Sequence, residues 1–300
     1  MTSSIFAPQQ MSQFGETELI LTPANRVYHL HLKNEEIADD VILVGDPGRV
    51  QKISRRFSNI EYQSAHREFI AHTGTFNGKR ITVLSTGIGP DNIDIVMNEL
   101  DAAVNINPVT RELVNNSRVL NIIRLGTSGS IQPDIGVNEL VTSSHGLGLD
   151  GLLHFYKGLN EINDPAITDE FAVQTGWKSP LPVPYCVQAD EGWLKKMGQG
   201  TITGITATAP GFYAPQGRQL RLEPSMAHLN EKLEAFRYGN LRITNFEMET
   251  SAIYGLGKLL GHRCVTVCVI IASRVRQQFT PDYEKSIDRL IEHALNKITS

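Results

Sequence analysis

The sequence predicts an α/β fold with a mostly central β-sheet, and three patterns lead to this prediction. Short runs rich in β-branched residues recur along the chain, and glycine-containing turns follow them. These runs are apolar almost throughout, which is typical of strands covered on both faces. Amphipathic helical patterns lie between some of the runs, and this alternation indicates the α/β class.

The predicted elements follow one another along the chain. The strand-like runs, each with its turn, lie in residues 40–50, 80–92, 118–131, 138–148, 200–210 and 263–274. A helix is predicted over residues 92–104, because apolar side chains return there at helical spacing. Another is predicted near the C-terminus, where Pro281 and Asp282 are start signals. Its apolar face would consist of Ile287, Leu290, Ile291, Ala294, Leu295 and Ile298.

The composition limits the classes of function. The 300 residues are 41% hydrophobic, enough for one large domain or two small ones with a buried core. The formal net charge of −4 does not favour nucleic acid or an anionic membrane as the main partner. The three cysteines show neither a disulfide pattern nor a zinc-ligand spacing, so we expect a reducing, cytoplasmic location. We find no signal-peptide core and no apolar run of membrane-spanning length.

The sequence predicts one domain with two peripheral segments. No internal repeat or low-complexity linker divides the chain, and we expect the domain to cover residues 25–300. Residues 1–24 are polar and are expected to form an N-terminal extension, either a mobile tail or a surface strap. Residues 157–199 have the least regular pattern and are expected to be a variable surface insertion within the domain.

Three segments combine arginine with glycine, hydroxyl or other polar residues: GDPGR (45–49), HREF (66–69) and RLGTSGS (124–130). Arginine binds an oxyanion through two parallel donors, and the amides of turns add further donors, so together the segments would suit inorganic phosphate. An arginine in a glycine turn is more often part of a surface loop. Arg124 is the exception, because it follows the apolar run LNII, and a buried arginine needs an anionic partner.

The segment GFYAPQGR (211–218) follows a predicted strand and suits a planar ring. Gln216 both donates and accepts hydrogen bonds, whereas Arg218 only donates. This pair matches a ring edge on which carbonyl and N–H groups alternate, and Phe212 would pack on the face of such a ring. The alternative is an ordinary proline- and glycine-containing loop.

The segment FEMETS (246–251) places two carboxylates between a predicted strand and a predicted helix. Acidic residues are favoured in the first turn of a helix, because they face the positive end of the helix dipole. A role of Glu247 and Glu249 at the helix start and a role in a binding site are therefore both open from the residues alone.

These motifs together resemble the nucleoside phosphorylase superfamily, and within it the uridine phosphorylases most closely. The similarity runs from about Val27 to the C-terminus and is weakest in residues 157–199. The matching runs are VYHLHL, GDPGRV, SAHREF, STGIG, RLGTSGSIQP, LDGLLHF, GFYAPQGR, FEMETSA and VIIASR. The resemblance implies a single three-layer-like α/β domain whose mixed sheet closes partly into a barrel. It also implies cleavage of uridine by phosphate to uracil and ribose 1-phosphate, in pyrimidine nucleoside salvage, with phosphate as co-substrate and no cofactor.

The resemblance implies a phosphate site that two subunits share. Gly45, Arg49, Arg124 and Thr127 match the phosphate-binding positions of the family. Arg67 matches an arginine that reaches the phosphate of the neighbouring subunit, and His29 matches a histidine that reaches the ribose 5′-hydroxyl across the same interface. The implied assembly is a homodimer with shared active sites, or a hexamer built from three such dimers.

The resemblance also divides the remaining positions between the sugar and the base. Glu247, Met248 and Glu249 match the ribose-binding segment, with Glu249 accepting from the sugar hydroxyls. The positions that match the base site are Phe212, Gln216, Arg218 and Arg274. Purine-specific relatives usually carry an aspartate at or beside this last position, whereas here Ser273 precedes Arg274, which argues against a purine nucleoside.

One departure from the family pattern concerns a cation. Some bacterial relatives bind a monovalent cation such as K⁺ at the dimer interface, through a serine and a glutamate that corresponds to Glu68. Asn92 stands here in place of that serine, which counts against such a site.

The alternative functions on the same scaffold are a purine nucleoside phosphorylase, a hydrolytic nucleosidase and a non-catalytic nucleoside-binding protein. A nucleosidase would not need three phosphate-binding arginines.

Overall fold

A mixed β-sheet forms the centre of the computed structural model, which describes residues 13–300. Within this part of the chain the sheet has 12 strands, ten of them in the order β11-β12-β10-β8-β13-β7-β1-β4-β3-β2. The strands of this order are β1 (Asp40–Val44), β2 (Asn59–His66), β3 (Phe69–Phe76), β4 (Lys79–Ser85), β7 (Asn121–Ser130), β8 (Leu140–Gly148), β10 (Ile202–Thr208), β11 (Arg237–Tyr238), β12 (Leu241–Glu247) and β13 (Arg263–Ser273). The short strands β9 (Tyr185–Gln188) and β14 (Gln278–Phe279) pair with β8 and β13.

Part of this sheet closes on itself. Strand β12 pairs with β10 and also, antiparallel, with β7, where Asn245 lies opposite Ser130 and Phe246 opposite Gly129. The strands β7, β12, β10, β8 and β13 therefore form a closed ring, while β1 to β4 extend from β7 as an open sheet. The prediction of a mixed sheet that is partly closed into a barrel is confirmed.

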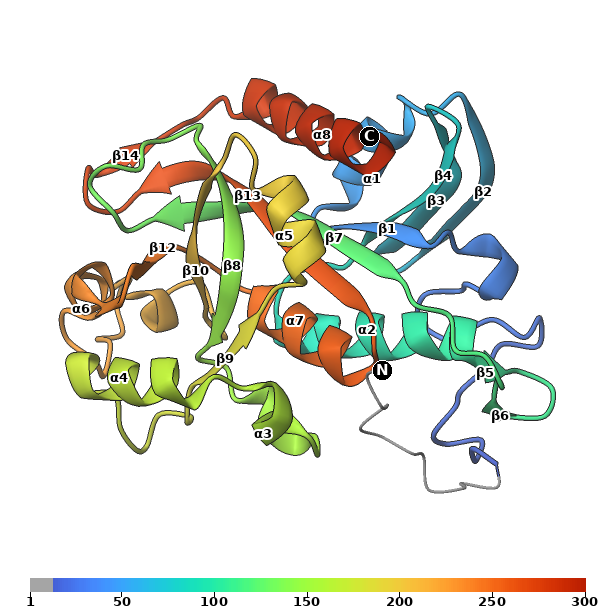
Figure 1. The fold of residues 1–300 in the computed structure, drawn as a ribbon, viewed down its shortest axis with the longest axis horizontal. Coiled ribbons are helices and arrows are strands. Elements are labelled where there is room, and N and C mark those ends of the chain that lie inside the picture. The colour runs from blue at the N-terminus through green and yellow to red at the C-terminus, as the bar shows by residue number, and fades with distance from the viewer. Residues whose placement is uncertain (1–12) are drawn as a thin grey trace.

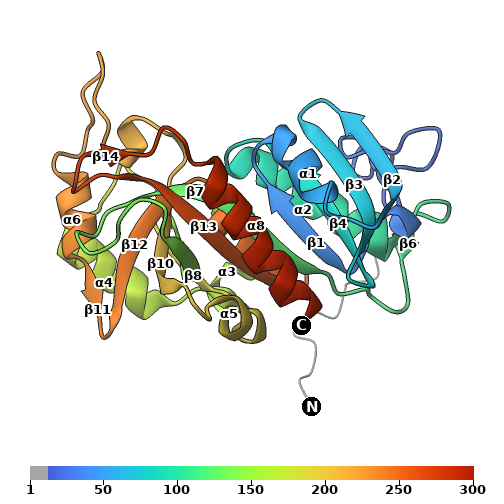
Figure 2. The same cartoon turned by 90° about the horizontal axis from the view of Figure 1, so that it is seen from above.

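Helices cover the sheet on two sides (Figure 1). Helices α2 (Pro90–Asn105) and α7 (Thr250–Leu259) pack together on one side, and α1 (Pro47–Ser54) and α8 (Glu284–Thr299) lie on the other. The two helices predicted from apolar spacing are confirmed as α2 and α8, and the predicted apolar face of α8 is buried throughout. Figure 2 shows α8 crossing the region between the barrel and the open part of the sheet.

The segment 157–199, which has the least regular sequence pattern, contains regular secondary structure. It contains α3 (Leu159–Ile162), α4 (Pro165–Thr175), β9 and α5 (Glu191–Met197). Strand β9 pairs with β8 and buries Tyr185 and Val187 completely, and α4 buries Phe171. The segment therefore supplies part of the core, and its short elements between prolines explain why the sequence pattern looked irregular.

The described part of the N-terminal extension is held to the domain. The amide of Phe14 donates to the carbonyl of Arg111 at 2.9 Å, and the Arg111 guanidinium donates to the carbonyls of Phe14, Gly15 and Leu19. Leu19 is buried. Residues 13–24 thus form a strap rather than a tail, while the rest of the predicted extension, residues 1–12, lies outside the described residues.

The described residues contain no helix that is long and apolar enough to cross a membrane. The three cysteines, Cys186, Cys264 and Cys268, are free and buried. The remaining short elements within residues 13–300 are α6 (Leu229–Ala235), the hairpin of β5 (Ile106–Asn107) and β6 (Glu112–Leu113), and the 3-10 turns Asn34–Glu36, Leu152–Phe155 and Ala214–Gln216.

Candidate active site

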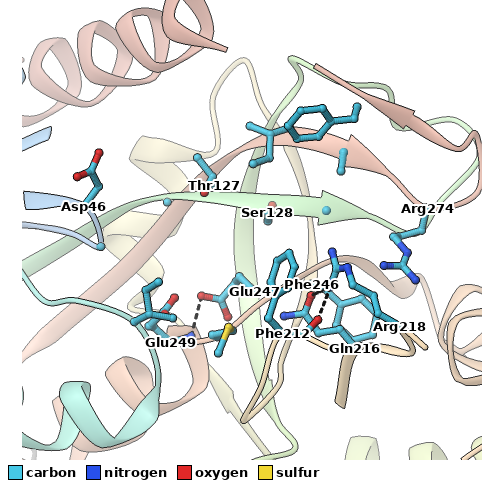
Figure 3. Close-up of a pocket in the computed structure, with 18 of the residues that line it drawn as sticks. Asp46, Thr127, Ser128, Phe212, Gln216, Arg218, Phe246, Glu247, Glu249 and Arg274 are labelled. Carbon is cyan, nitrogen blue, oxygen red and sulfur yellow. Dashed lines mark hydrogen bonds between the residues drawn. The ribbon is translucent and has the colours of Figure 1, made fainter. Parts of the chain in front are cut away.

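A cavity of about 950 Å³ opens where strands β1, β4, β10, β12 and β13 end. This edge of the sheet is where open α/β folds bind their ligands. Its walls include 11 of the predicted site residues: Gly45, Arg49, Arg124, Thr127, Phe212, Gln216, Arg218, Glu247, Met248, Glu249 and Arg274. Figure 3 shows Asp46 and Glu249 at one end and Gln216, Arg218 and Arg274 at the other.

The GDPGR segment brings Arg49 to the cavity through a strand-to-helix turn. Strand β1 ends before it, the Asp46 carboxylate accepts the Gly48 amide at 2.9 Å, and Pro47 opens α1. This is the N-terminal capping that the residue types predict, and it places Arg49 in the first turn of the helix. Arg49 Nη1 donates to the carbonyl of Leu125 at 3.1 Å. Burial lowers the pKa of Arg49. The carboxylate of Asp46 opposes this effect, whereas the positive charge of Arg124 lowers the pKa further.

The sequence suggested a glycine turn for the RLGTSGS segment. In the structure, this segment forms the larger part of strand β7. A glycine is needed at position 126 for steric reasons, because a Cβ there would lie 1.9 Å from Arg124 Nη1 and 2.7 Å from Cys268 Sγ. The glycine therefore leaves room for the guanidinium of Arg124 beside the strand. Thr127 and Ser128, the next two residues, both line the cavity.

Arg124 is the buried centre of a charged cluster. Its Nη2 donates to Glu249 and lies 3.2 Å from a carboxylate oxygen of Glu247, and its Nη1 lies 3.3 Å from Cys268 Sγ. Burial disfavours the charge of Arg124, yet Glu249 and Glu247 together raise its pKa above the usual value. The expectation that this buried arginine has an anionic partner is confirmed within the protein itself.

The two glutamates of FEMETS do different things. The Glu247 carboxylate accepts the Thr208 hydroxyl at 2.7 Å and the amides of Glu249 and Thr250 at 3.0 Å, so it caps α7. Glu249 accepts the Gly89 amide at 2.8 Å on one oxygen and Arg124 on the other, which leaves lone pairs that can accept further donors. Burial raises the pKa of Glu249, Glu247 raises it further, and Arg124 opposes both.

The opposite end of the cavity carries an amide and two guanidinium groups. Arg218 Nη1 donates to Gln216 Oε1 and to the carbonyl of Phe212, both at 2.6 Å, and its guanidinium lies 3.8 Å from the centre of the Phe212 ring. Arg274 Nη2 donates to the carbonyl of Gly217 at 3.3 Å. Burial and the neighbouring Arg274 lower the pKa of Arg218 to about 10. This end offers donors together with an aromatic face.

Two of the predicted site residues, His29 and Arg67, do not line the cavity. His29 Nδ1 lies 2.6 Å from a carboxylate oxygen of Glu99. Arg67 is exposed, and its guanidinium lies 6.0 Å from the centre of the Tyr28 ring, which is itself 5.0 Å from the His29 ring. The two residues therefore lie near each other, outside the lining of the cavity in their own subunit.

The two positions that the resemblance ties to a cation lie close together. A Cβ on Gly87 would be 3.2 Å from Glu68 Cγ and 2.3 Å from the Asn92 amide nitrogen. Among residues 13–300, no group of three or more His, Cys, Asp or Glu side chains is placed to hold a metal ion.

Some walls of the cavity were not predicted. They include Gly87 and Ile88 after β4, and Gln277, Gln278 and Phe279 around the short strand β14. The β13–β14 hairpin has no phosphate-like or base-like motif, so the only signal for these residues was their position shortly after a predicted strand.

Comparison with known proteins agrees with this geometry. The family model of the phosphorylase superfamily matches residues 39–297. The chain belongs to this superfamily. A uridine phosphorylase of Thermococcus kodakarensis is 31% identical over 92% of this chain and 87% of its own length. A purine nucleoside phosphorylase of the DeoD type from Clostridium perfringens is 28% identical over 89% of this chain and 97% of its own length.

A solved structure of a nucleoside phosphorylase has a similar fold along most of this chain. The nucleoside phosphorylase of Trypanosoma brucei, described as showing uridine phosphorylase activity, superposes with a TM-score of 0.87 at 29% identity. The alignment covers 94% of this chain and all of the trypanosomal chain.

Proposed function

We propose that this protein is a uridine phosphorylase, a pentosyltransferase that converts uridine and phosphate into uracil and ribose 1-phosphate. The observation that carries the proposal is the order of groups along one cavity. Arg49 and Arg124 line the cavity, Glu249 contacts Arg124 at one end, and Gln216 and Arg218 lie at the opposite end. A phosphate on the arginines, a ribose at Glu249 and a uracil at the opposite end would follow one another in this order. The uridine phosphorylases among the relatives support the same activity.

The phosphate would bind at the cationic end. Arg49 and Arg124 would supply charge, and Gly45 and Thr127 would supply short polar contacts on either side. Gly45 suits this place, because a Cβ there would already lie 3.3 Å from the carbonyl of Gly87. Arg67 would contribute from the partner subunit, since it lies outside the cavity of its own subunit.

The ribose would lie against FEMETS. Glu249 would accept from the sugar hydroxyls, because its oxygens are only partly satisfied by Gly89 and Arg124. Met248 would contact the sugar, and Glu247 would hold the segment in place by accepting the amides of Glu249 and Thr250. His29 of the partner subunit would contact the 5′-hydroxyl, with Glu99 of its own subunit orienting the ring.

The uracil would occupy the amide–guanidinium end. Phe212 would pack on its face, Gln216 would pair with its edge, and Arg218 and Arg274 would face its carbonyl oxygens. When the N1–C1′ bond breaks, its electron pair goes to the uracil ring. Donors placed beforehand stabilise the resulting charge on the oxygens without a catalytic acid. On release the uracil anion takes up one proton, which balances the proton that HPO₄²⁻ loses when it becomes the ribose 1-phosphate dianion.

The attacking phosphate has two tasks in this mechanism. One of its oxygens forms the new bond to C1′ as the bond to N1 breaks, which gives ribose 1-phosphate. Its negative charge also stabilises the positive charge that develops on the sugar ring before that bond is complete. Holding phosphate and nucleoside side by side removes the entropic part of the barrier.

We propose a homodimer with shared active sites as the smallest active unit, which a hexamer would contain three times. His29 and Arg67 lie near each other and outside the lining of the cavity in their own subunit, which supports this proposal. We also propose that residues 25–300 are the catalytic domain and that the enzyme acts in the cytoplasm, in keeping with its free, buried cysteines.

A purine nucleoside is the second candidate substrate, because the purine nucleoside phosphorylase of Clostridium perfringens is nearly as similar. The acidic residues that line the cavity are Asp46, Glu247 and Glu249, and none of them belongs to the end formed by Gln216, Arg218 and Arg274. A base site without a carboxylate favours a pyrimidine over a purine that must be protonated.

The proposal is tested by measuring release of base from uridine, thymidine, inosine and adenosine, with and without phosphate. We expect phosphate-dependent release of uracil from uridine and little turnover of the two purine nucleosides. Faster cleavage of inosine or adenosine would replace the proposal by the purine alternative, and turnover of uridine without phosphate would make the protein a nucleosidase.

A further inference from the structure

A buried threonine behind the cavity is hydrogen-bonded to the charged cluster. Thr208 is the last residue of β10 and lies opposite Glu247 of β12 in the sheet. Its Oγ1 accepts the Ser251 amide at 3.0 Å and lies 2.7 Å from Glu247 Oε1. Because an amide can only donate, the threonine oxygen must accept from Ser251, and its own proton is directed to Glu247.

Every partner of the Glu247 carboxylate in the described structure is a donor. These partners are the Thr208 hydroxyl, the amides of Glu249 and Thr250, and the guanidinium of Arg124. They come from three different elements, β10, the start of α7, and β7. Glu247 is therefore fixed in position, and it in turn holds Arg124 on one side and the first turn of α7, next to Glu249, on the other.

The far side of this chain of hydrogen bonds is anchored too. Asp150, in the loop after β8, accepts the Tyr185 hydroxyl at 2.8 Å and the Ser251 hydroxyl at 3.1 Å. Ser251 is thus held by its side chain through Asp150 and by its amide through Thr208. The network runs from Asp150 through Ser251, Thr208 and Glu247 to Arg124 and the amide of Glu249. Among the hydrogen bonds of residues 13–300, those of Thr208 are the only ones that join Ser251 to Glu247.

We propose that Thr208 is a positioning residue for ribosyl transfer, which sets the places of Arg124 and Glu249 through Glu247 although it does not line the cavity. The proposal rests on the proposed function, in which Arg124 holds phosphate and Glu249 holds ribose. Replacement by valine keeps the shape of the side chain but leaves the Ser251 amide without its acceptor and removes one donor from Glu247. With one donor fewer, Glu247 attracts the guanidinium of Arg124 more strongly. Arg124 then neutralises the charge of Glu249 less completely.

The test compares the wild-type enzyme with Thr208→Val, Thr208→Ser and Thr266→Val. Thr266 is the matched control, because it is buried in the barrel strand β13 and its hydroxyl has no hydrogen-bond partner within residues 13–300. We expect Thr208→Val to lower kcat for uridine phosphorolysis by about 10- to 100-fold, the effect of losing a hydrogen bond to a charged group. Thr208→Ser, which restores the hydroxyl, should stay within about threefold of the wild type, and Thr266→Val should match it.

The pH profile gives a readout that loss of packing alone would not move. The groups that face Glu249 are Arg124 of β7, Glu247 of β12 and the Gly89 amide before α2. With Arg124 drawn towards Glu247, the pKa of Glu249 rises, and the acid limb of activity moves to higher pH. We expect this shift in Thr208→Val and in neither of the other two variants.

A binding measurement separates this proposal from the proposed function. Inorganic phosphate should raise the melting temperature of the wild type, because a ligand of the folded state stabilises it. Thr208→Val should lose most of that rise, whereas Thr208→Ser and Thr266→Val should keep it. If Thr208→Val keeps the full rise and the wild-type pH profile, or if serine fails to restore them, Thr208 has no positioning role. A wild-type protein that responds to phosphate but does not cleave uridine contradicts only the proposed function.

Discussion

Replacement of Gly126 by alanine tests whether the position of Arg124 controls the reaction. The new Cβ would lie 1.9 Å from Arg124 Nη1, whereas real Cβ atoms essentially never approach another heavy atom within 3.0 Å. The guanidinium must therefore move by the difference of 3.0 and 1.9 Å, about 1.1 Å. Cys268 Sγ would lie 2.7 Å from the same Cβ, so both neighbouring side chains must shift.

A displacement of this size in a site that positions two substrates should be costly. Misplacement by about 1 Å lowers rates by roughly 100-fold, equivalent to about 2.7 kcal/mol of transition-state stabilisation. We expect Gly126→Ala to lower kcat/KM for phosphate by about this factor and to reduce the rise in melting temperature that phosphate causes.

Gly129→Ala is the matched control in the same strand. Its Cβ would meet only the carbonyl of Ala272, at an ordinary 3.8 Å, and would leave Arg124 in place. Steady-state kinetics and thermal melting with and without phosphate should distinguish the two variants. If Gly126→Ala binds phosphate and turns over as well as Gly129→Ala does, the location of Arg124 beside Gly126 is not important for activity.

Three further predictions follow from the site. Arg218→Ala should lower kcat/KM for uridine by about 100-fold, as loss of a charge-stabilising donor does, while the melting shift with phosphate stays unchanged; unchanged uridine turnover would refute the base-site assignment. Burial raises the pKa of Glu249, and only the ionised carboxylate can accept hydrogen bonds from both ribose hydroxyls. Activity should therefore fall as the pH drops through a value above the usual range for glutamate. A pH–rate profile that stays flat down to the ordinary glutamate range would contradict this role. Mixing the inactive variants Arg67→Ala and Arg124→Ala should restore activity to about a quarter of the wild-type level, since half of randomly re-formed dimers contain one intact site of two; no recovery after subunit exchange would rule out shared sites.

Local sequence patterns were sufficient for most of the fold. The apolar stripes of α2 and α8 and the β-branched runs of the barrel strands reflect burial that each segment shows by itself. The pairing of β7 with β12, which closes the barrel, joins residues more than 100 positions apart, and only the family resemblance implied it. The glycines of RLGTSGS looked like a turn, because the sequence does not show that Gly126 is needed for the side chain of Arg124.

The candidate site was predictable where a residue type is unusual for its surroundings. Arg124 follows an apolar run, and Glu249 follows a buried strand, so each required a polar partner. Their mutual contact could not be derived in this way, since it depends on how β7 and β12 meet. Thr208 is harder still: a threonine that ends a strand is ordinary in sequence, and only its two hydrogen bonds set it apart.

The charges of the cavity give a physical reason for a shared site. At the phosphate and ribose end, the two guanidinium groups of Arg49 and Arg124 face the three carboxylates of Asp46, Glu247 and Glu249, so the residues of one subunit leave one net negative charge. Asp46 is exposed and is screened by solvent, but the pair of Glu247 and Glu249 is buried with Arg124. A phosphate dianion added to this end needs at least one more cation. Arg67 of the partner subunit would supply it, and a separated subunit should then bind phosphate poorly even though all its own residues are in place.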